Sequence, residues 1–109
     1  MIYEMRTYYA MPGKLRAVVQ RFADVTHDLF LKYGFRPVGY WTESVGDNTK
    51  FHYMLAWEDD AERRAKWAEF RDDPERIRAF AESEKDGLIV ARIENSIWEA
   101  TSFSPQLPA

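Results

Sequence analysis

The sequence switches between two hydrophobic periods, and the order of these switches limits the folds that the chain can adopt. Four stretches alternate between two sets of side chains, which is the pattern of a β-strand with one row on each face. These stretches are residues 2–10, 36–44, 50–58 and 88–100. The regions between the first and second strands and between the third and fourth repeat their apolar residues every three or four positions, which predicts helices. The predicted order is therefore strand, helix, strand, strand, helix, strand.

The predicted helices carry their own start and stop signals. Residues 15–33 form a long amphipathic pattern that ends at Gly34, a residue that suits a C-terminal cap. Asp59 and Glu62 have the spacing of a capping box, in an Asp-for-Ser form, and predict the start of the second helix. Pro74 interrupts that helix and suits the first position of a third, short helix.

This order is the split βαβ, or ferredoxin-like, pattern, and it predicts an α+β fold with a four-stranded antiparallel sheet. The broken second helix counts as one crossover, so the first and last strands become neighbours. All the helical segments then lie on one face of the sheet. The opposite face receives no cover from the chain itself.

Large apolar side chains are predicted on that uncovered face. They are Ile2, Tyr8, Leu88, Val90 and Trp98, together with one row of the third strand. Monomeric proteins rarely expose so large an apolar patch to water. We therefore expect a homodimer in which two sheets pack face to face and enclose a shared interior, forming a dimeric α/β barrel. The other arrangement is a single chain that uses this face for a partner protein.

Composition excludes several classes of protein. The net charge is -3 and the pI is near 5.4, which argues against nucleic acid as a partner. Charged residues interrupt every apolar segment before the roughly 20 residues of a spanning helix, so we expect no membrane insertion. The absence of cysteine and of a secretion-type start favours a cytoplasmic location. We expect one domain over residues 1–101 and an irregular C-terminal arm over residues 102–109, which contains two prolines.

Short segments spread along nearly the whole chain form a recognisable series. They are Ile2-Tyr3-Glu4-Met5-Arg6-Thr7-Tyr8, Pro12-Gly13-Lys14, Val38-Gly39-Tyr40-Trp41-Thr42, Tyr53-Met54-Leu55-Ala56-Trp57-Glu58, Asp73-Pro74-Glu75 and Arg92-Ile93-Glu94-Asn95. In this order and spacing they resemble the NIPSNAP family, a group of dimeric α+β barrel proteins. Arg76 and His52 depart from the pattern, because members often carry Trp at the first position and an apolar residue at the second. The resemblance implies the barrel fold and dimerisation, and since the family has no settled reaction it implies no catalytic residue.

Charged residues at alternate positions of the first and last strands suggest a ligand pocket. Glu4 shares a strand face with Arg6, and Arg92 shares one with Glu94, so we expect opposite charges to meet on the face without helices. The candidate pocket consists of Glu4, Arg6, Tyr8, His52, Arg92, Glu94 and Trp98. In one interpretation, desolvation raises the pKa of a glutamate, which then serves as a base. In the other, these residues are cross-strand ion pairs that fix register and dimer geometry.

His27 and His52 are the only histidines, so any imidazole chemistry depends on these two side chains. We expect His27, next to Asp28 in the first helix, to face solvent. The orientation of His52 is not determined by the pattern. Some related barrels ligate haem iron through a histidine, so haem at His52 is the alternative to our expectation of no cofactor. We expect no metal site, because the acidic pairs suit helix starts and solvated helix faces.

Two classes of function remain open from the sequence. The first is a homodimeric barrel that binds a small apolar or aromatic ligand, with cofactor-free monooxygenase-like or isomerase activity by analogy to other barrels. The second is a non-catalytic protein-interaction or sensing module. The sequence lacks a Gly-rich phosphate loop, a Cys pair and a recognisable Ser or Cys nucleophile motif, so the catalytic residues stay unknown.

Overall fold

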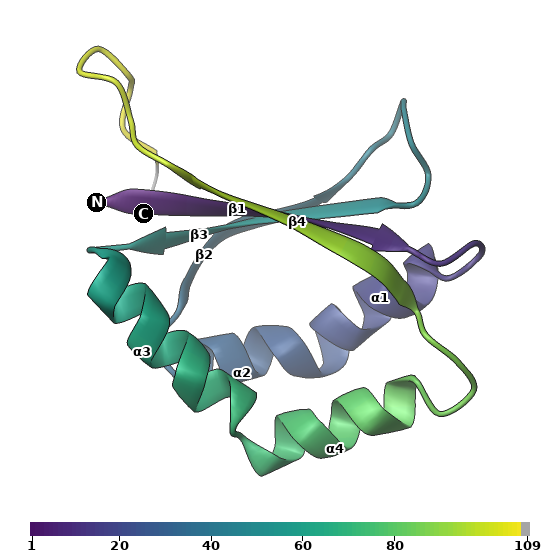
Figure 1. The fold of residues 1–109 in the computed structure, drawn as a ribbon. Coiled ribbons are helices and arrows are strands. Elements are labelled where there is room, and N and C mark those ends of the chain that lie inside the picture. The colour runs from purple at the N-terminus through teal and green to yellow at the C-terminus, as the bar shows by residue number, and fades with distance from the viewer. Residues whose placement is uncertain (108–109) are drawn as a thin grey trace.

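The sheet has four antiparallel strands in the spatial order β2-β3-β1-β4. The computed structural model describes residues 1–107. Its strands are β1 (Ile2–Ala10), β2 (Arg36–Thr42), β3 (Lys50–Trp57) and β4 (Val90–Trp98). The first and last strands are neighbours, and the helices all lie on one side of the sheet (Figure 1). The predicted α+β, ferredoxin-like arrangement is confirmed.

The first helical region is continuous but not uniform. It consists of α1 (Leu15–Arg21), a π-helical turn η1 (Phe22–Thr26) and α2 (His27–Lys32). Gly34 follows in a left-handed conformation, with φ of +79°, which glycine adopts without the steric cost that other residues meet. The helix predicted over residues 15–33 is therefore confirmed, although its pattern gave no sign of the π-turn, a feature frequent at functional sites.

The second helical region is broken where the sequence predicts. Helix α3 (Asp60–Arg71) begins after Asp59, whose side chain accepts a hydrogen bond from the Glu62 backbone N–H at 2.8 Å. Helix α4 (Pro74–Ser83) begins after Asp73, whose side chain accepts from the Arg76 backbone N–H at 3.0 Å. Both caps supply acceptors for backbone donors that the first turn leaves unpaired.

Aromatic rings fill the layer between the sheet and the helices. The layer includes Tyr8, Phe22, Phe30, Phe35, Phe51, Tyr53, Trp57, Trp67 and Phe70. Within it, the rings of Phe30 and Phe35 stack with centroids 4.6 Å apart, and Phe30 also meets Trp67 edge-on. Packing of this kind contributes stability beyond the area that it buries. The core therefore lies on the helix side of the sheet.

The other side of the sheet, which we call the open face, is bare of helices (Figure 1). Strand pairing places on it Tyr3, Met5, Thr7 and Tyr9 of β1, Trp41 of β2, His52 and Met54 of β3, and Arg92, Glu94, Ser96 and Trp98 of β4. Trp41 and Trp98 are each 47% exposed. The described part of the C-terminal arm lines a cleft of about 550 Å³ at one end of this face, beside Tyr3 and Met54.

The expectation that Ile2, Tyr8 and Val90 lie on the uncovered face is wrong. Tyr8 packs against Phe22 of the helix layer, and Ile2 and Val90 pack against the same core. Alternation separates the two rows of a strand but does not say which row meets the helices. Trp98 does lie on the open face, whereas Leu88 precedes β4.

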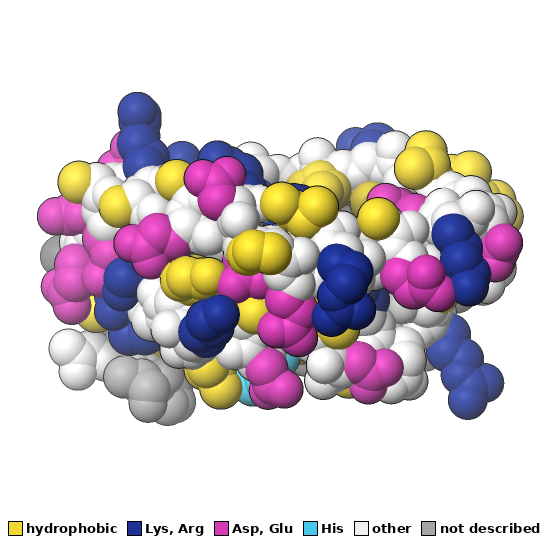
Figure 2. All heavy atoms as spheres, turned by 90° about the horizontal axis from the view of Figure 1, so that it is seen from below, with side chains coloured by type: hydrophobic (Ala, Val, Ile, Leu, Met, Phe, Trp, Pro, Cys, Tyr) yellow, Lys and Arg dark blue, Asp and Glu magenta, His cyan; other side chains and the backbone are white. Residues whose placement is uncertain are grey.

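The outer surface of the helices carries mixed charge. Acidic and basic side chains are interspersed there, with apolar side chains scattered among them (Figure 2). None of the helices in the described part of the chain is long and apolar enough to cross a bilayer. The domain boundary after residue 101 stays a prediction, and residues 108–109 of the predicted arm lie outside the described residues.

Candidate functional site

A buried carboxylate lies between the sheet and α3. Glu4 of β1 is 0% exposed, and its Oε1 accepts hydrogen bonds from Trp57 Nε1 at 3.0 Å and Trp67 Nε1 at 2.9 Å. Its Oε2 lies 3.4 Å from Arg6 Nη1 and 3.5 Å from Arg63 Nη1. A buried charge is costly unless it is paired and hydrogen-bonded. Two indole donors and two guanidinium groups meet that requirement here.

Arg6 connects this carboxylate to a pair of tyrosines. Its Nε donates to Tyr53 Oη at 2.7 Å, and the hydroxyl oxygens of Tyr53 and Tyr8 lie 3.1 Å apart. The Arg6 guanidinium carbon lies 4.7 Å from the ring centroid of Trp67. Burial raises the pKa of the Tyr53 hydroxyl well above its usual value, so Tyr53 stays neutral. Polar side chains thus form one connected chain inside the aromatic layer.

The structure brings together three of the residues predicted for the ligand pocket and separates them from the other four. Glu4, Arg6 and Tyr8 point toward the helices, as their contacts with Trp67 and Phe22 show. The remaining residues, His52, Arg92, Glu94 and Trp98, lie on the open face. The sheet stands between the two sets.

The expected ion pairs between the first and last strands are therefore wrong. In the observed register, Glu4 lies opposite Ile97 and Arg6 lies opposite Asn95. Arg92 instead pairs with Glu94 on its own strand, with Nη1 3.2 Å from Oε1. A shift of one residue in the pairing of two strands moves each side chain to the other face of the sheet. The alternation in the sequence does not determine the pairing between β1 and β4.

The orientation of His52, which the sequence left undetermined, is toward the open face. Its Nδ1 lies 2.8 Å from Thr7 Oγ1, and its Nε2 lies 2.7 Å from Glu43 Oε2. Both ring nitrogens are engaged within the protein, so an iron ion would have to displace one of these bonds. Among residues 1–107, no group of three His, Cys, Asp or Glu side chains is arranged to hold a metal ion.

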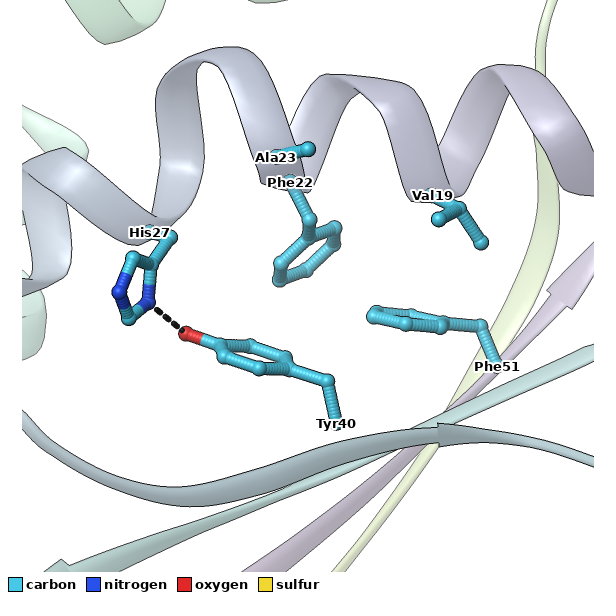
Figure 3. Close-up of a pocket in the computed structure, with 6 residues that line it drawn as sticks. All are labelled: Val19, Phe22, Ala23, His27, Tyr40 and Phe51. Carbon is cyan, nitrogen blue, oxygen red and sulfur yellow. Dashed lines mark hydrogen bonds between the residues drawn. The ribbon is translucent and has the colours of Figure 1, made fainter.

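A hollow of about 330 Å³ opens between the first helical region and the sheet (Figure 3). It is lined by Val19, Phe22, Ala23, His27, Tyr40 and Phe51. The π-turn supplies Phe22 and Ala23, and His27 follows directly after it. The lining is apolar except for the His27 imidazole and the Tyr40 hydroxyl, whose polar atoms meet at one end of the hollow (Figure 3).

His27 and Tyr40 form a hydrogen-bonded pair. His27 Nδ1 and Tyr40 Oη lie 2.8 Å apart, and the two rings meet edge-on. Burial raises the pKa of the Tyr40 hydroxyl above its usual value, so Tyr40 remains a neutral phenol at neutral pH. The expectation that His27 faces solvent is wrong, because the ring is half-buried against Tyr40.

One sequence signal could have revealed the hollow. Val19, Ala23 and His27 recur every four residues and therefore share one side of the helix. Val19 and Ala23 are small enough to leave space beside the sheet. The position of Tyr40 opposite this row depends on strand pairing, which the sequence pattern does not specify.

The hollow and the buried carboxylate are close neighbours within the aromatic layer. The Phe22 ring lines the hollow, and its centroid lies 5.0 Å from that of Tyr53, which accepts the hydrogen bond from Arg6. Tyr40 also lies beside Tyr53, with ring centroids 5.9 Å apart. A change in the packing of Phe22 or Tyr53 would therefore affect both the hollow and the polar side chains around Glu4.

Comparison with known proteins agrees with this fold. A NIPSNAP protein of unknown function from Agrobacterium tumefaciens is 24% identical, with a TM-score of 0.84, over 96% of this chain and 92% of that one. An uncharacterised NIPSNAP-like domain protein from Burkholderia xenovorans is 25% identical, with a TM-score of 0.84, over 98% of this chain and 90% of that one. SnoaB, a cofactor-independent oxygenase from Streptomyces nogalater, shares the fold at 16% identity and a TM-score of 0.66, over 96% and 97% of the two chains. No functionally curated protein matches the sequence.

The family itself is identified by sequence over almost the full chain. The NIPSNAP family model matches residues 3–105, which include all the helices and strands described above apart from Ile2, the first residue of β1. This match confirms the resemblance inferred from the short segments along the sequence. The chain belongs to the NIPSNAP family.

Proposed function

We propose that this protein is a homodimeric barrel that binds a small aromatic molecule in the hollow lined by His27 and Tyr40. The observation that carries the proposal is the composition of this hollow, in which one polar pair stands in an apolar and aromatic wall. Ligand sites commonly combine an apolar lining with a few polar groups that orient the ligand. A volume of about 330 Å³ suits a molecule of one or two rings.

The polar pair favours a ligand that carries a hydroxyl group. When the Tyr40 hydroxyl donates its proton to His27 Nδ1, the Tyr40 oxygen keeps its lone pairs free to accept another hydrogen bond. A phenol or naphthol in the hollow can donate to that oxygen. The ring of such a ligand would pack between Phe51 and the helix residues Val19 and Phe22 (Figure 3).

The same pair offers a route for a proton. A ligand hydroxyl can pass its proton to Tyr40 while Tyr40 passes its own to His27, which makes the imidazole the final base. Loss of this proton leaves an electron-rich phenolate. The cofactor-independent oxygenase that shares the fold supports, by analogy alone, a reaction of this ligand with oxygen.

The homodimer is proposed because the open face carries apolar side chains that the helices do not cover. Tyr3, Met5, Trp41 and Trp98 present apolar surface there, and the helices cover only the opposite side. A second copy of the chain offers a matching surface with two-fold symmetry. A different partner protein on this face is the alternative that a measurement of mass in solution would reveal.

Binding of 2-naphthol, with naphthalene as the matched ligand that lacks the hydroxyl, tests the ligand proposal. We expect Tyr40→Phe to lower the affinity for 2-naphthol about tenfold, which corresponds to the loss of one hydrogen bond. The affinity for naphthalene should not change. Ala23→Trp should fill the hollow and abolish binding of both. Ala68→Trp, on the exposed side of α3, is the control and should bind both ligands normally.

A second measurement tests turnover in the same hollow. With 1,4-dihydroxynaphthalene, which can supply electrons to oxygen, the wild-type protein should consume oxygen faster than the buffer alone. His27→Gln should return the rate to that of the buffer, because glutamine cannot accept the proton. If Ala23→Trp binds 2-naphthol as well as the wild type does, the hollow is not the site and the proposal is wrong.

A further inference from the structure

A buried arginine lies between the first helical region and α4. Arg21, the last residue of α1, is 8% exposed. Its guanidinium carbon lies 4.0 Å from the centroid of the Phe80 ring, and its Nη1 donates to Ser83 Oγ at 3.2 Å. Among residues 1–107, its Nε has no hydrogen-bond partner, and no carboxylate oxygen lies within ion-pair distance of the guanidinium. A buried cation of this kind is costly unless a negative group pairs with it.

The surroundings of Arg21 only partly compensate its charge. Burial lowers the pKa of the Arg21 guanidinium, whereas Glu84, whose Oε2 accepts from the Ile89 backbone N–H at 3.2 Å, raises that pKa from beyond ion-pair distance. The other buried guanidinium of the helix side, that of Arg6, lies 3.4 Å from the Glu4 carboxylate. An arginine side chain stays protonated in a protein. Arg21 therefore offers a positive charge to an anionic group from outside the chain.

A groove of about 430 Å³ gives access to this charge. Its lining includes Arg21 and Ser83, together with the apolar side chains of Ala17, Val25, Ala79 and Ile89. The helices that form it lie on the side of the sheet opposite the open face (Figure 1). A second copy of the chain on the open face would therefore leave the groove exposed. Its volume lies within the range that is typical of sites for small molecules.

The rim of the groove is mainly acidic. Exposed charged side chains line it, namely Asp24, Glu75, Arg78 and Glu82. Glu82 already pairs with Lys85 at 2.7 Å. Asp24 follows Arg21 by three residues, so the two lie on the same side of the helical region, and Asp24 Oδ1 accepts from Gln20 Nε2 at 2.9 Å. This rim would repel a ligand that carries only negative charge, whereas it would attract an ammonium group.

We propose that this groove binds a free α-amino acid with an apolar side chain, whose carboxylate pairs with Arg21 and whose ammonium group pairs with Asp24. Guanidinium groups bind carboxylates through strong, charge-assisted hydrogen bonds. In an α-amino acid the two charged groups are attached to the same carbon atom, which suits two partners on one side of a helical region. The apolar side chain of the ligand packs against Val25, Ala79 and Ile89.

The groove is separate from the hollow that His27 and Tyr40 line. The two have no lining residue in common, although the π-turn contributes to both. It supplies Phe22 and Ala23 to the hollow, and it supplies Asp24 and Val25 to the groove. The amino-acid proposal does not depend on the function proposed for the hollow, and either proposal can fail alone.

Titration of the full chain with leucine, followed by NMR of the backbone amides, tests the assignment. We expect the amide signals of Arg21 and Asp24 to shift and to saturate below about 10 mM leucine, a concentration that nearly fills even a site of millimolar affinity. Two matched ligands each lack one charge: 4-methylpentanoate is leucine without its amino group, and 3-methylbutylamine is leucine without its carboxylate. Each should bind about tenfold more weakly or worse, because one charged hydrogen bond is lost.

Variants assign the two charged partners. Arg21→Met keeps an aliphatic side chain against Phe80 but removes the charge, so it should lower the affinity for leucine about 10- to 100-fold. Asp24→Asn should lower the affinity for leucine about tenfold and should not lower that for 4-methylpentanoate, which has no ammonium group. Arg16→Met removes an exposed cation of the same helix outside the groove and is the matched control, which should bind leucine as the wild type does.

A variant that removes no charge keeps the test decisive if Arg21→Met does not fold. Ala79→Trp should fill the groove and abolish leucine binding, whereas Tyr40→Phe, which alters only the hollow, should bind leucine normally. The proposal is overturned if leucine causes no saturable shift in the wild-type protein or if a folded Ala79→Trp variant binds leucine as tightly. It is also overturned if 4-methylpentanoate binds as tightly as leucine, which would indicate a site for simple anions.

Discussion

Strand β1 presents two very different environments on its two sides. On the helix side, Glu4 is fully buried, and its carboxylate accepts from two indoles and pairs with two guanidinium groups of the sheet and α3. On the open side, Thr7 belongs to a partly exposed polar cluster with His52 and Glu43. The helices cover only one face, so the contacts that hold the chain together concentrate there. The open face is left for association with another molecule.

The largest effect is expected from Glu4→Ala. Removal of the carboxylate leaves Arg6 and Arg63 without their shared counter-charge and two indole donors without an acceptor, so unfolding free energy should fall by roughly 3–5 kcal/mol. Urea denaturation measures this value. Glu94→Ala removes an exposed carboxylate from the open face and should cost less than about 1 kcal/mol. Equal losses for the two variants would contradict the contrast between the faces.

A smaller loss is expected when one indole donor is removed. Trp67→Phe keeps an aromatic ring but leaves Glu4 Oε1 with one hydrogen bond fewer, which should cost roughly 1–3 kcal/mol. Trp98→Phe is the matched change on the open face, where the indole N–H donates to the exposed Ser96 hydroxyl. Under dilute conditions that favour single chains, it should change the unfolding free energy by less than about 0.5 kcal/mol. Chemical denaturation of both variants provides the comparison.

The helix side should also respond to acid. Glu62 accepts from Arg36 Nη2 at 2.8 Å, and this bond lowers the pKa of Glu62 from 4.5 to about 2. Its pKa is lower in the folded state, so the contribution of this carboxylate is complete above pH 4.5 and is lost as the pH falls toward 2. Thermal unfolding at several pH values should show a shallower decline over this window for Glu62→Gln. An identical decline in both proteins would mean that Glu62 does not contribute.

Local sequence signals predicted the elements well. As the sequence indicates, Asp59 caps α3, Pro74 begins α4 and Gly34 ends the first helical region, because each depends only on residues close in the chain. The order of elements was enough to place β4 beside β1. These features follow from periodicity and capping, which are local properties.

The candidate site was less predictable because it depends on which row of a strand meets the helices. The alternation placed Glu4 and Arg6 in one row correctly, but it could not show that α3 would supply Trp67 and Arg63 to that row. The register between β1 and β4, which puts Glu4 and Glu94 on opposite faces of the sheet, also depends on residues far apart in the chain. The partnership of His27 with Tyr40 also requires two distant elements to meet.

The central claim is that the two faces of the sheet have different tasks and that a second copy of the chain covers the open one. Sedimentation velocity at micromolar concentration tests this claim most directly. We expect a species of twice the 12.9 kDa of one chain, and we expect Met5→Asp, on the open face, to convert it to single folded chains. A wild-type protein that sediments as one chain at this concentration would contradict the account.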